Sequence, residues 1–157
     1  MTTLPASRDW LQRRVTQLVQ NEVMNEVFIG HQGAFHFRVV QSERNSDGTS
    51  DYLIVTVDLG GLRASKRVYD YDKWSPLLSY FEELERNWRG WDGDKSFKSL
   101  EGDFGLSAKH DGHVRVFFEL EDFDRPNAWA AKGEIILDPG EELTAAVEEL
   151  RALLSAR

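Results

Sequence analysis

The stretch WSPLLSYFEELERNWRGWDG, residues 74–93, does most to define the fold. Its apolar residues recur at helical spacing and form one stripe, made of Trp74, Leu77, Leu78, Phe81, Leu84 and Trp88. Glutamate and arginine fall mostly off this stripe, which is the pattern of a helix that buries one face. Ser75 is a suitable N-cap, Pro76 fits the first helical position, and Gly90 can adopt the left-handed conformation that ends a helix. The pattern therefore predicts an amphipathic helix followed by a turn that contains tryptophan.

On both sides of this helix, apolar and polar residues alternate, as they do in strands with one buried face. These segments are 35–39, 52–59, 100–108, 114–120 and 129–137. The short spacings between them favour antiparallel pairing. We expect an α+β fold, with an antiparallel sheet of about six strands and two or three helices mainly on one face of it.

Helical patterns also occur at both ends of the chain. The final helix begins at Asp138-Pro139-Gly140-Glu141, which resembles a capping box, and the first helix begins at Ser7. A length of 157 residues favours one domain. We therefore expect a single domain over residues 1–157, with an N-terminal helical arm at 1–22 and the sheet and helices at 23–157.

Composition and charge narrow the classes of partner. The net charge is -8, and it arises after residue 50, because residues 1–50 carry five Lys/Arg and five Asp/Glu. An acidic surface repels a phosphate backbone, so we expect no nucleic-acid partner and instead a basic protein partner. No apolar run approaches the ~20 residues that span a bilayer, and the N-terminus lacks the pattern of a secretory signal. With no cysteine in the chain, we expect a cytoplasmic protein without a membrane partner.

The cluster His110-Asp111-Gly112-His113 has the residue types of a metal site or a catalytic base. Apolar residues on its two sides match best if Leu106 faces Val116 and Lys109 faces His113. The loop would then be residues 110–112, with glycine at the left-handed position of a common three-residue turn. We therefore predict a hairpin turn here, and neither a metal site, a cofactor site nor a catalytic residue.

Two surfaces remain candidates for binding. The turn after the helix offers indole rings beside a guanidinium and a carboxylate, so its candidate ligand-binding residues are Trp88, Arg89, Trp91 and Asp92. The same residues also suit a purely structural joint, in which the tryptophans pack on the core. An acidic run offers a docking patch for a basic partner, or simply a solvated strand end, through Glu119, Glu121, Asp122 and Asp124.

Residues 59–154 resemble a bacterial, mainly actinobacterial family called domain of unknown function 6228. The motifs that carry the likeness are Gly61-Leu62-Arg63-Ala64, Trp88-Arg89-Gly90-Trp91-Asp92-Gly93, Ser99-Leu100-Glu101-Gly102 and His110-Asp111-Gly112-His113-Val114. In the family, more residues tend to separate the His-Asp-Gly from the following His-Val, and such variation fits a hairpin tip. The resemblance implies an α+β fold and no known activity.

Three functions follow as hypotheses. The chain has no phosphate-binding loop, no nucleophile elbow and no zinc-protease helix, so an enzyme is the less favoured class. The first hypothesis is a small acidic binding protein, of the immunity or antitoxin kind, that neutralises a basic protein by charge complementarity. The second is a small-molecule-binding or enzymatic domain with a pocket at the tryptophan turn. The third is a homo-oligomeric module that associates through a sheet edge or its first helix.

Overall fold

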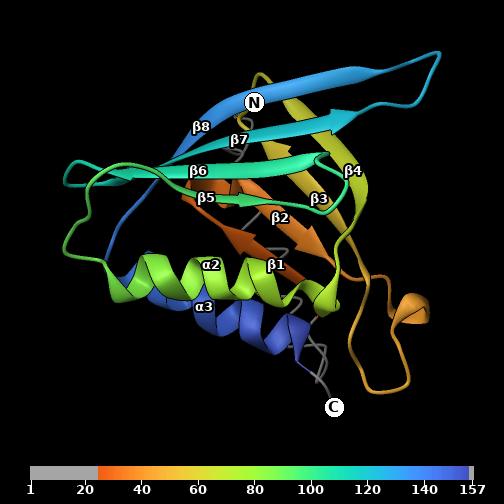
Figure 1. Ribbon diagram of the computed structural model, residues 1–157, viewed down its shortest axis with the longest axis horizontal. Coiled ribbons are helices and arrows are strands. Elements are labelled where there is room, and N and C mark those ends of the chain that lie inside the picture. Colours follow the sequence, from red (N-terminus) through yellow and green to blue (C-terminus); the bar gives the residue numbers. More distant parts are fainter. Residues whose placement is uncertain (1–24, 156–157) are drawn as a thin grey trace, which may run out of the picture.

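The computed structural model describes residues 25–155, which form two four-stranded antiparallel sheets and two long helices (Figure 1). The predicted N-terminal arm, residues 1–22, lies outside the described residues. The first sheet contains, in spatial order, β1 (Glu26–Ile29), β2 (Phe35–Arg38), β3 (Tyr52–Asp58) and β4 (Arg63–Tyr69). The second sheet contains, in the same way, β5 (Lys95–Lys98), β6 (Phe104–His110), β7 (Val114–Asp122) and β8 (Trp129–Leu137). The helices are α2 (Ser75–Arg86) and α3 (Glu141–Leu154), and a short 3-10 turn, η1 (His31–Gly33), joins β1 to β2.

The α+β class and the antiparallel pairing are confirmed, but the prediction of one sheet with about six strands is wrong. Two sheets that each bury one face produce the same alternation as one larger sheet, so the pattern does not count sheets. The strands β1 and β5 have four residues each and are too short for a clear pattern. The strand β4 reads RASKRVY, and its inward-facing Lys66 interrupts the apolar face.

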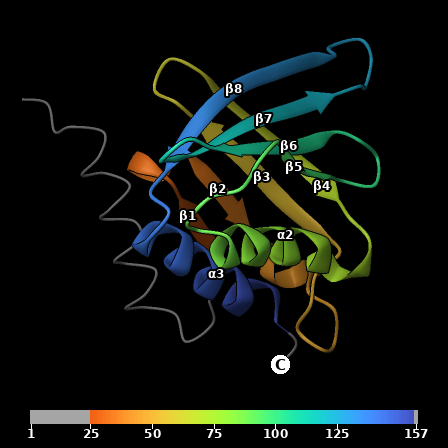
Figure 2. The same cartoon turned by 60° about the vertical axis from the view of Figure 1, so that its left-hand side comes forward.

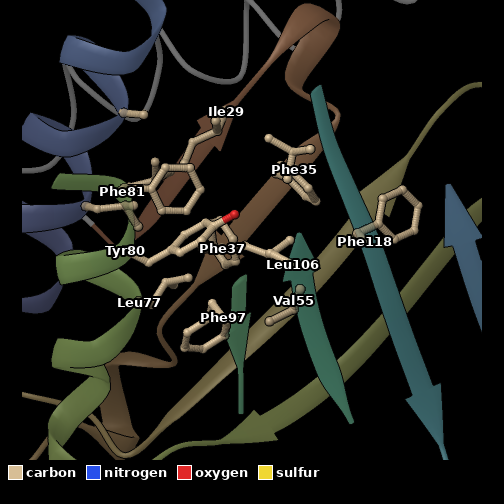
Figure 3. Close-up of a cluster of buried hydrophobic side chains, with 14 of the residues drawn as sticks. Ile29, Phe35, Phe37, Val55, Leu77, Tyr80, Phe81, Phe97, Leu106 and Phe118 are labelled. Carbon is tan, nitrogen blue, oxygen red and sulfur yellow. The ribbon is translucent and has the colours of Figure 1, made fainter. Parts of the chain in front are cut away.

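The inner faces of the two sheets pack on each other through aromatic rings (Figure 3). Phe35 lies edge-on to Phe118 with ring centroids 5.9 Å apart, and Phe37 lies 6.0 Å from Phe104. All four side chains are buried. These β2 contacts with β7 and β6 hold the two sheets together, because buried aromatic pairs contribute beyond the area that they remove from water.

The two helices lie side by side along one side of the core, where α3 contacts β1 and α2 contacts β5 (Figures 1 and 2). The predicted stripe of α2 is buried at Trp74, Leu77, Phe81 and Leu84. The helix ends at Arg86 rather than at Gly90, since the side chain of Asn87 donates a hydrogen bond to the carbonyl of Glu83 and the chain then turns. Trp88 therefore falls beyond the buried stripe.

The β6–β7 hairpin pairs His110 with Val114 and Leu106 with Phe118, so its loop is residues 111–113. The predicted register was wrong by two residues. A shift of two leaves every side chain on the same face of the sheet, so the matching of apolar residues cannot detect it. The predicted inward faces of both strands are correct.

Candidate functional site

The two tryptophans of the tryptophan turn, residues 88–93, have different environments. Trp91 packs against the core, and its indole Nε1–H donates to the carbonyl of Ala108 over 3.3 Å. Trp88 is 48% exposed, with the guanidinium carbon of Arg89 5.1 Å from its ring centroid. Arg89 and Asp92 are both exposed and form no ion pair with each other. Of the four predicted ligand-binding residues, Trp88, Arg89 and Asp92 are exposed, and Arg89 lies against the Trp88 ring.

A histidine ties this turn to the β6–β7 hairpin. The backbone N–H of Gly112 donates to Nδ1 of His110 over 3.2 Å, so Nδ1 is the unprotonated nitrogen. The Nε2–H of the same ring then donates to the carbonyl of Trp88 over 2.7 Å. Trp91 lies edge-on to the imidazole with centroids 5.2 Å apart. Both ring nitrogens of His110 are engaged in hydrogen bonds, so this side chain connects the tryptophan turn to the hairpin turn.

The carboxylate of the same cluster also has a structural partner. Arg115 donates to Asp111 over 2.7 Å and to Glu134 of β8 over 2.6 Å. The guanidinium lowers the pKa of Asp111 and keeps it ionised. His113 is exposed at the loop. The cluster is therefore organised as a turn held by arginine.

A buried polar cluster, which the sequence patterns did not reveal, joins β4 to the β5–β6 turn. Lys66 donates to Asp103 over 2.7 Å, and the hydroxyl of Ser99 donates to the other oxygen of Asp103 over 2.7 Å. Asp70 accepts the backbone N–H of Leu100 over 3.0 Å through Oδ1, while its buried Oδ2 has no partner among the described residues. Burial raises the pKa of Asp70, and the nearby charge of Asp103 adds to the rise. The motif at residues 99–102, which carries part of the family resemblance, was the only sequence signal for this cluster. It did not point to Asp70.

The acidic run lies at the end of the β7–β8 hairpin. Glu119 and Glu121 belong to the outer face of β7, while Asp122 ends the strand and accepts the backbone N–H of Asp124 over 2.9 Å. Glu119 has a distant cationic neighbour, Lys132, at 3.7 Å. Within the described residues, neither Glu121 nor Asp124 forms an ion pair. The structure thus places the four predicted partner-binding residues along one end of one hairpin.

The outward-facing side chains of this hairpin form a surface that we call the hairpin face. It consists of Arg115, Phe117, Glu119 and Glu121 from β7 and Ala130, Lys132, Glu134 and Ile136 from β8. Phe117 is 39% exposed and Ile136 is 46% exposed. Phe117 lies opposite Glu134, so Ile136 is its diagonal neighbour, within reach of an aromatic side chain. The hairpin face therefore has an apolar pair surrounded by charges.

The acidic tip of the hairpin, residues 121–124, adds a third exposed apolar side chain, that of Phe123. Figure 1 shows the β7–β8 loop projecting at the end of the hairpin, away from the helices. The alternation along β7 places Phe117 on the outer face, because Phe118 follows it and faces the core, but only the structure shows that this outer face is left exposed. The tip and the hairpin face together offer apolar contact area beside acidic charge.

Over residues 25–155, no three His, Cys, Asp or Glu side chains converge as a metal ion requires. Neither α2 nor α3, in the same part of the chain, has the length and apolar character needed to cross a membrane.

The comparisons with known proteins identify a family and no function. No curated protein matches the chain, and no solved structure matches it. The model called Family of unknown function (DUF6228) matches residues 30–157. The resemblance inferred over residues 59–154 is thus confirmed and extends to β2 and β3. Because the match covers most of the 157 residues, the chain belongs to this family of unknown function.

Proposed function

We propose that this chain is a non-enzymatic protein-binding domain of the immunity or antitoxin kind. Its partner is a basic protein, and its binding surface is the hairpin face together with the acidic tip. The observation that carries the proposal is the gathering of exposed apolar side chains on this hairpin. Seven large apolar side chains are exposed in the described residues, and three of them, Phe117, Phe123 and Ile136, belong to the β7–β8 hairpin.

The composition of the hairpin face resembles that of a protein interface. Scattered exposed apolar residues are ordinary, but a group of them surrounded by polar residues is typical of a contact surface. Phe117 and Ile136 supply the apolar centre, and charged residues of the hairpin face lie around them. Aromatic side chains at the centre of an interface contribute most of the binding energy.

The charge of the chain favours a basic partner. Glu121 and Asp124 form no ion pair within residues 25–155, and the whole chain carries a net charge of -8. Carboxylates of this kind steer a basic partner toward the surface and raise the association rate, more than they raise the affinity. We therefore expect association to slow as the salt concentration rises.

A second candidate function is a small-molecule site at Trp88 and Arg89, which is favoured by the half-exposed indole beside a guanidinium. A planar ligand could stack on this pair. The commitment of Trp91 to the core and of the Trp88 carbonyl to His110 argues for a structural joint, which is why we place this function second.

Photo-crosslinking in the native host tests the proposal. A photoreactive amino acid replaces Phe117, and in a matched strain it replaces Leu100, another exposed apolar residue that lies in the β5–β6 turn. We expect position 117, and not position 100, to give an adduct with a protein of net positive charge. Replacing Glu121 and Asp124 by glutamine and asparagine should reduce the adduct, and replacing the exposed Glu101 by glutamine should not.

Three outcomes count against the proposal. Equal adducts at both positions indicate non-specific contact. An adduct only with a second copy of the chain indicates the homo-oligomer instead. An adduct with an acidic protein contradicts the charge argument.

A further inference from the structure

The strand β8 is a free edge of the second sheet. It pairs with β7 on one side and with no described strand on the other (Figures 1 and 2). Every second residue of an edge strand directs its backbone N–H and C=O groups away from the sheet. On this free side, β8 forms no backbone hydrogen bond with any other described residue. Its nine residues contain no proline, so the edge can pair with another strand.

The other three edge strands in the described part of the chain are less available. The strands β1 and β5 have four residues each and lie against α3 and α2. The strand β4 carries three cationic side chains, Arg63, Lys66 and Arg67, and no anionic one. Pairing of β4 with a second copy of itself would therefore bring like charges together.

The sequence of β8, WAAKGEIIL, is complementary to itself in antiparallel pairing. Gly133 is its midpoint, so a two-fold axis at this residue pairs all nine residues of one copy with the nine of another. On the outer face, Lys132 of each copy then lies opposite Glu134 of the other copy. On the same face, Ala130 of each copy lies opposite the exposed Ile136 of the other. Opposite charges and apolar residues that face each other across two strands stabilise a sheet.

The charges of β8 favour this register over its neighbours. If the axis lies one residue away, either Lys132 or Glu134 faces its own copy, and like charges directly opposite each other are destabilising. If the axis lies between two residues, the outer face of one copy is set against the inner face of the other. Only the axis at Gly133 pairs opposite charges and keeps the two outer faces on one side.

Both charged groups and the space beside the strand can accept a second copy. Arg115 donates to Oε1 of Glu134, while Oε2 accepts no hydrogen bond from the described residues. The ammonium group of Lys132 is 3.7 Å from Glu119, which is longer than a hydrogen bond, and the side chain is 66% exposed. Residues 134–136 border a cavity of about 460 Å³. Because consecutive side chains point to opposite faces of a sheet, a cavity that all three residues line lies along the edge.

We infer that β8 pairs with β8 of a second copy of this chain, antiparallel about a two-fold axis at Gly133, so that the two second sheets become one continuous sheet. The hairpin faces of both copies then lie on the same side of the joined sheet. The inference goes beyond the protein-binding function and does not depend on it. Phe117 belongs to β7 and not to the edge, so it stays open to a basic partner in the dimer.

Sedimentation equilibrium of the full chain tests the association. We expect a reversible dimer of twice the monomer mass of 18.0 kDa, and a species of monomer mass at every concentration overturns the inference. Lys132→Glu and Glu134→Lys should each weaken dimerisation about ten-fold or more, because two favourable pairs become two repulsive ones. The matched controls are Lys109→Glu on β6 and Glu121→Lys on β7, which make the same changes of charge away from the edge. Both controls should dimerise like the native chain.

A mixture of the two edge variants tests the register. Each variant carries like charges at positions 132 and 134, of the sign opposite to those of the other variant. The mixture should therefore form a heterodimer, which the sedimentation of one fluorescently labelled variant measures, although each variant alone remains largely monomeric.

Two results overturn the inference in this second experiment. The first is the absence of a heterodimer when circular dichroism shows both variants to be folded. The second is a native-like dimer of Lys132→Glu alone, since this variant leaves the contact of Arg115 with Glu134 untouched. Neither result affects the crosslinking of Phe117 to a basic protein.

Discussion

Replacing Gly133 by alanine perturbs the contact between β8 and the core. A Cβ atom at this position would lie 2.8 Å from Cε1 of Phe118 and 2.9 Å from Cδ1 of Leu59. Carbon atoms pack favourably at about 3.5–4.0 Å, so both groups must move by about 0.6 Å or more. Leu59 is partly exposed and can rotate, but Phe118 is 1% exposed and lies against Phe35. Overpacking of this kind costs about 1–3 kcal/mol, and we expect that loss in the free energy of unfolding.

The matched control is Gly105→Ala on β6, a strand of the same sheet. There the added Cβ meets only the carbonyl oxygen of Phe97 at 3.6 Å, an ordinary contact. Alanine is favoured over glycine in a strand by roughly 0.5–1 kcal/mol, so we expect this control to be as stable as the native chain or more stable. Urea denaturation measures both. If Gly133→Ala is as stable as Gly105→Ala, then Phe118 does not pack against β8 as described.

Three further predictions concern the buried carboxyl, the tryptophan turn and the hairpin face. Burial raises the pKa of Asp70 above its ordinary value of 3.8, so protonation of this carboxyl favours the folded state. This contribution to the free energy of unfolding is complete below pH 3.8 and is lost as the pH rises through the raised pKa. Asp70→Asn should remove this loss, and urea denaturation above pH 3.8 will show whether the difference from the native chain grows. Trp91→Phe loses a hydrogen bond and should cost about 0.5–1.5 kcal/mol, whereas Trp88→Ala should change stability by less than about 0.5 kcal/mol; similar losses would contradict their different environments. Phe117→Ser should change the free energy of unfolding by no more than about 0.5 kcal/mol, and a larger loss in thermal denaturation would mean that this ring supports the fold.

The elements that could be predicted from sequence are those in which local pattern and tertiary burial agree. The stripe of α2 is such a case, because Leu77, Phe81 and Leu84 recur at helical spacing and are all buried. Trp88 continues the same spacing but lies beyond the last helical residue, where the spacing no longer places it against the core. The helix ends early because of the hydrogen bonds of Asn87, and the spacing of apolar residues in the sequence does not reveal such bonds.

The arrangement of the strands was harder to predict from the sequence, as particular residues show. Lys66 faces inward on β4 because Asp103, from the β5–β6 turn, neutralises it. A lysine in that position makes the strand look solvated, although its ion pair is partly buried. The two sheets pack on each other through contacts such as that between Phe35 and Phe118, which join residues more than eighty positions apart.

Some features of the candidate sites could also be predicted from the sequence, and others required the structure. The acidic run was visible from Glu119 to Asp124, since charge is a property of the sequence itself. The apolar centre at Phe117 and the free edge of β8 depend on which faces and edges the tertiary structure leaves open. The role of His110 could not be predicted from the sequence, because only its two hydrogen bonds show that it connects two turns.

Hydrogen–deuterium exchange of the chain, alone and with the crosslinked partner added in purified form, tests the central claim most directly. If the hairpin face and the acidic tip bind the partner, exchange will slow at β8 and in the loop 123–128 and will be unchanged at the tryptophan turn. High salt should weaken this protection, since the acidic residues steer the association. Slowed exchange at residues 88–93, with β8 and its loop unchanged, would contradict the account.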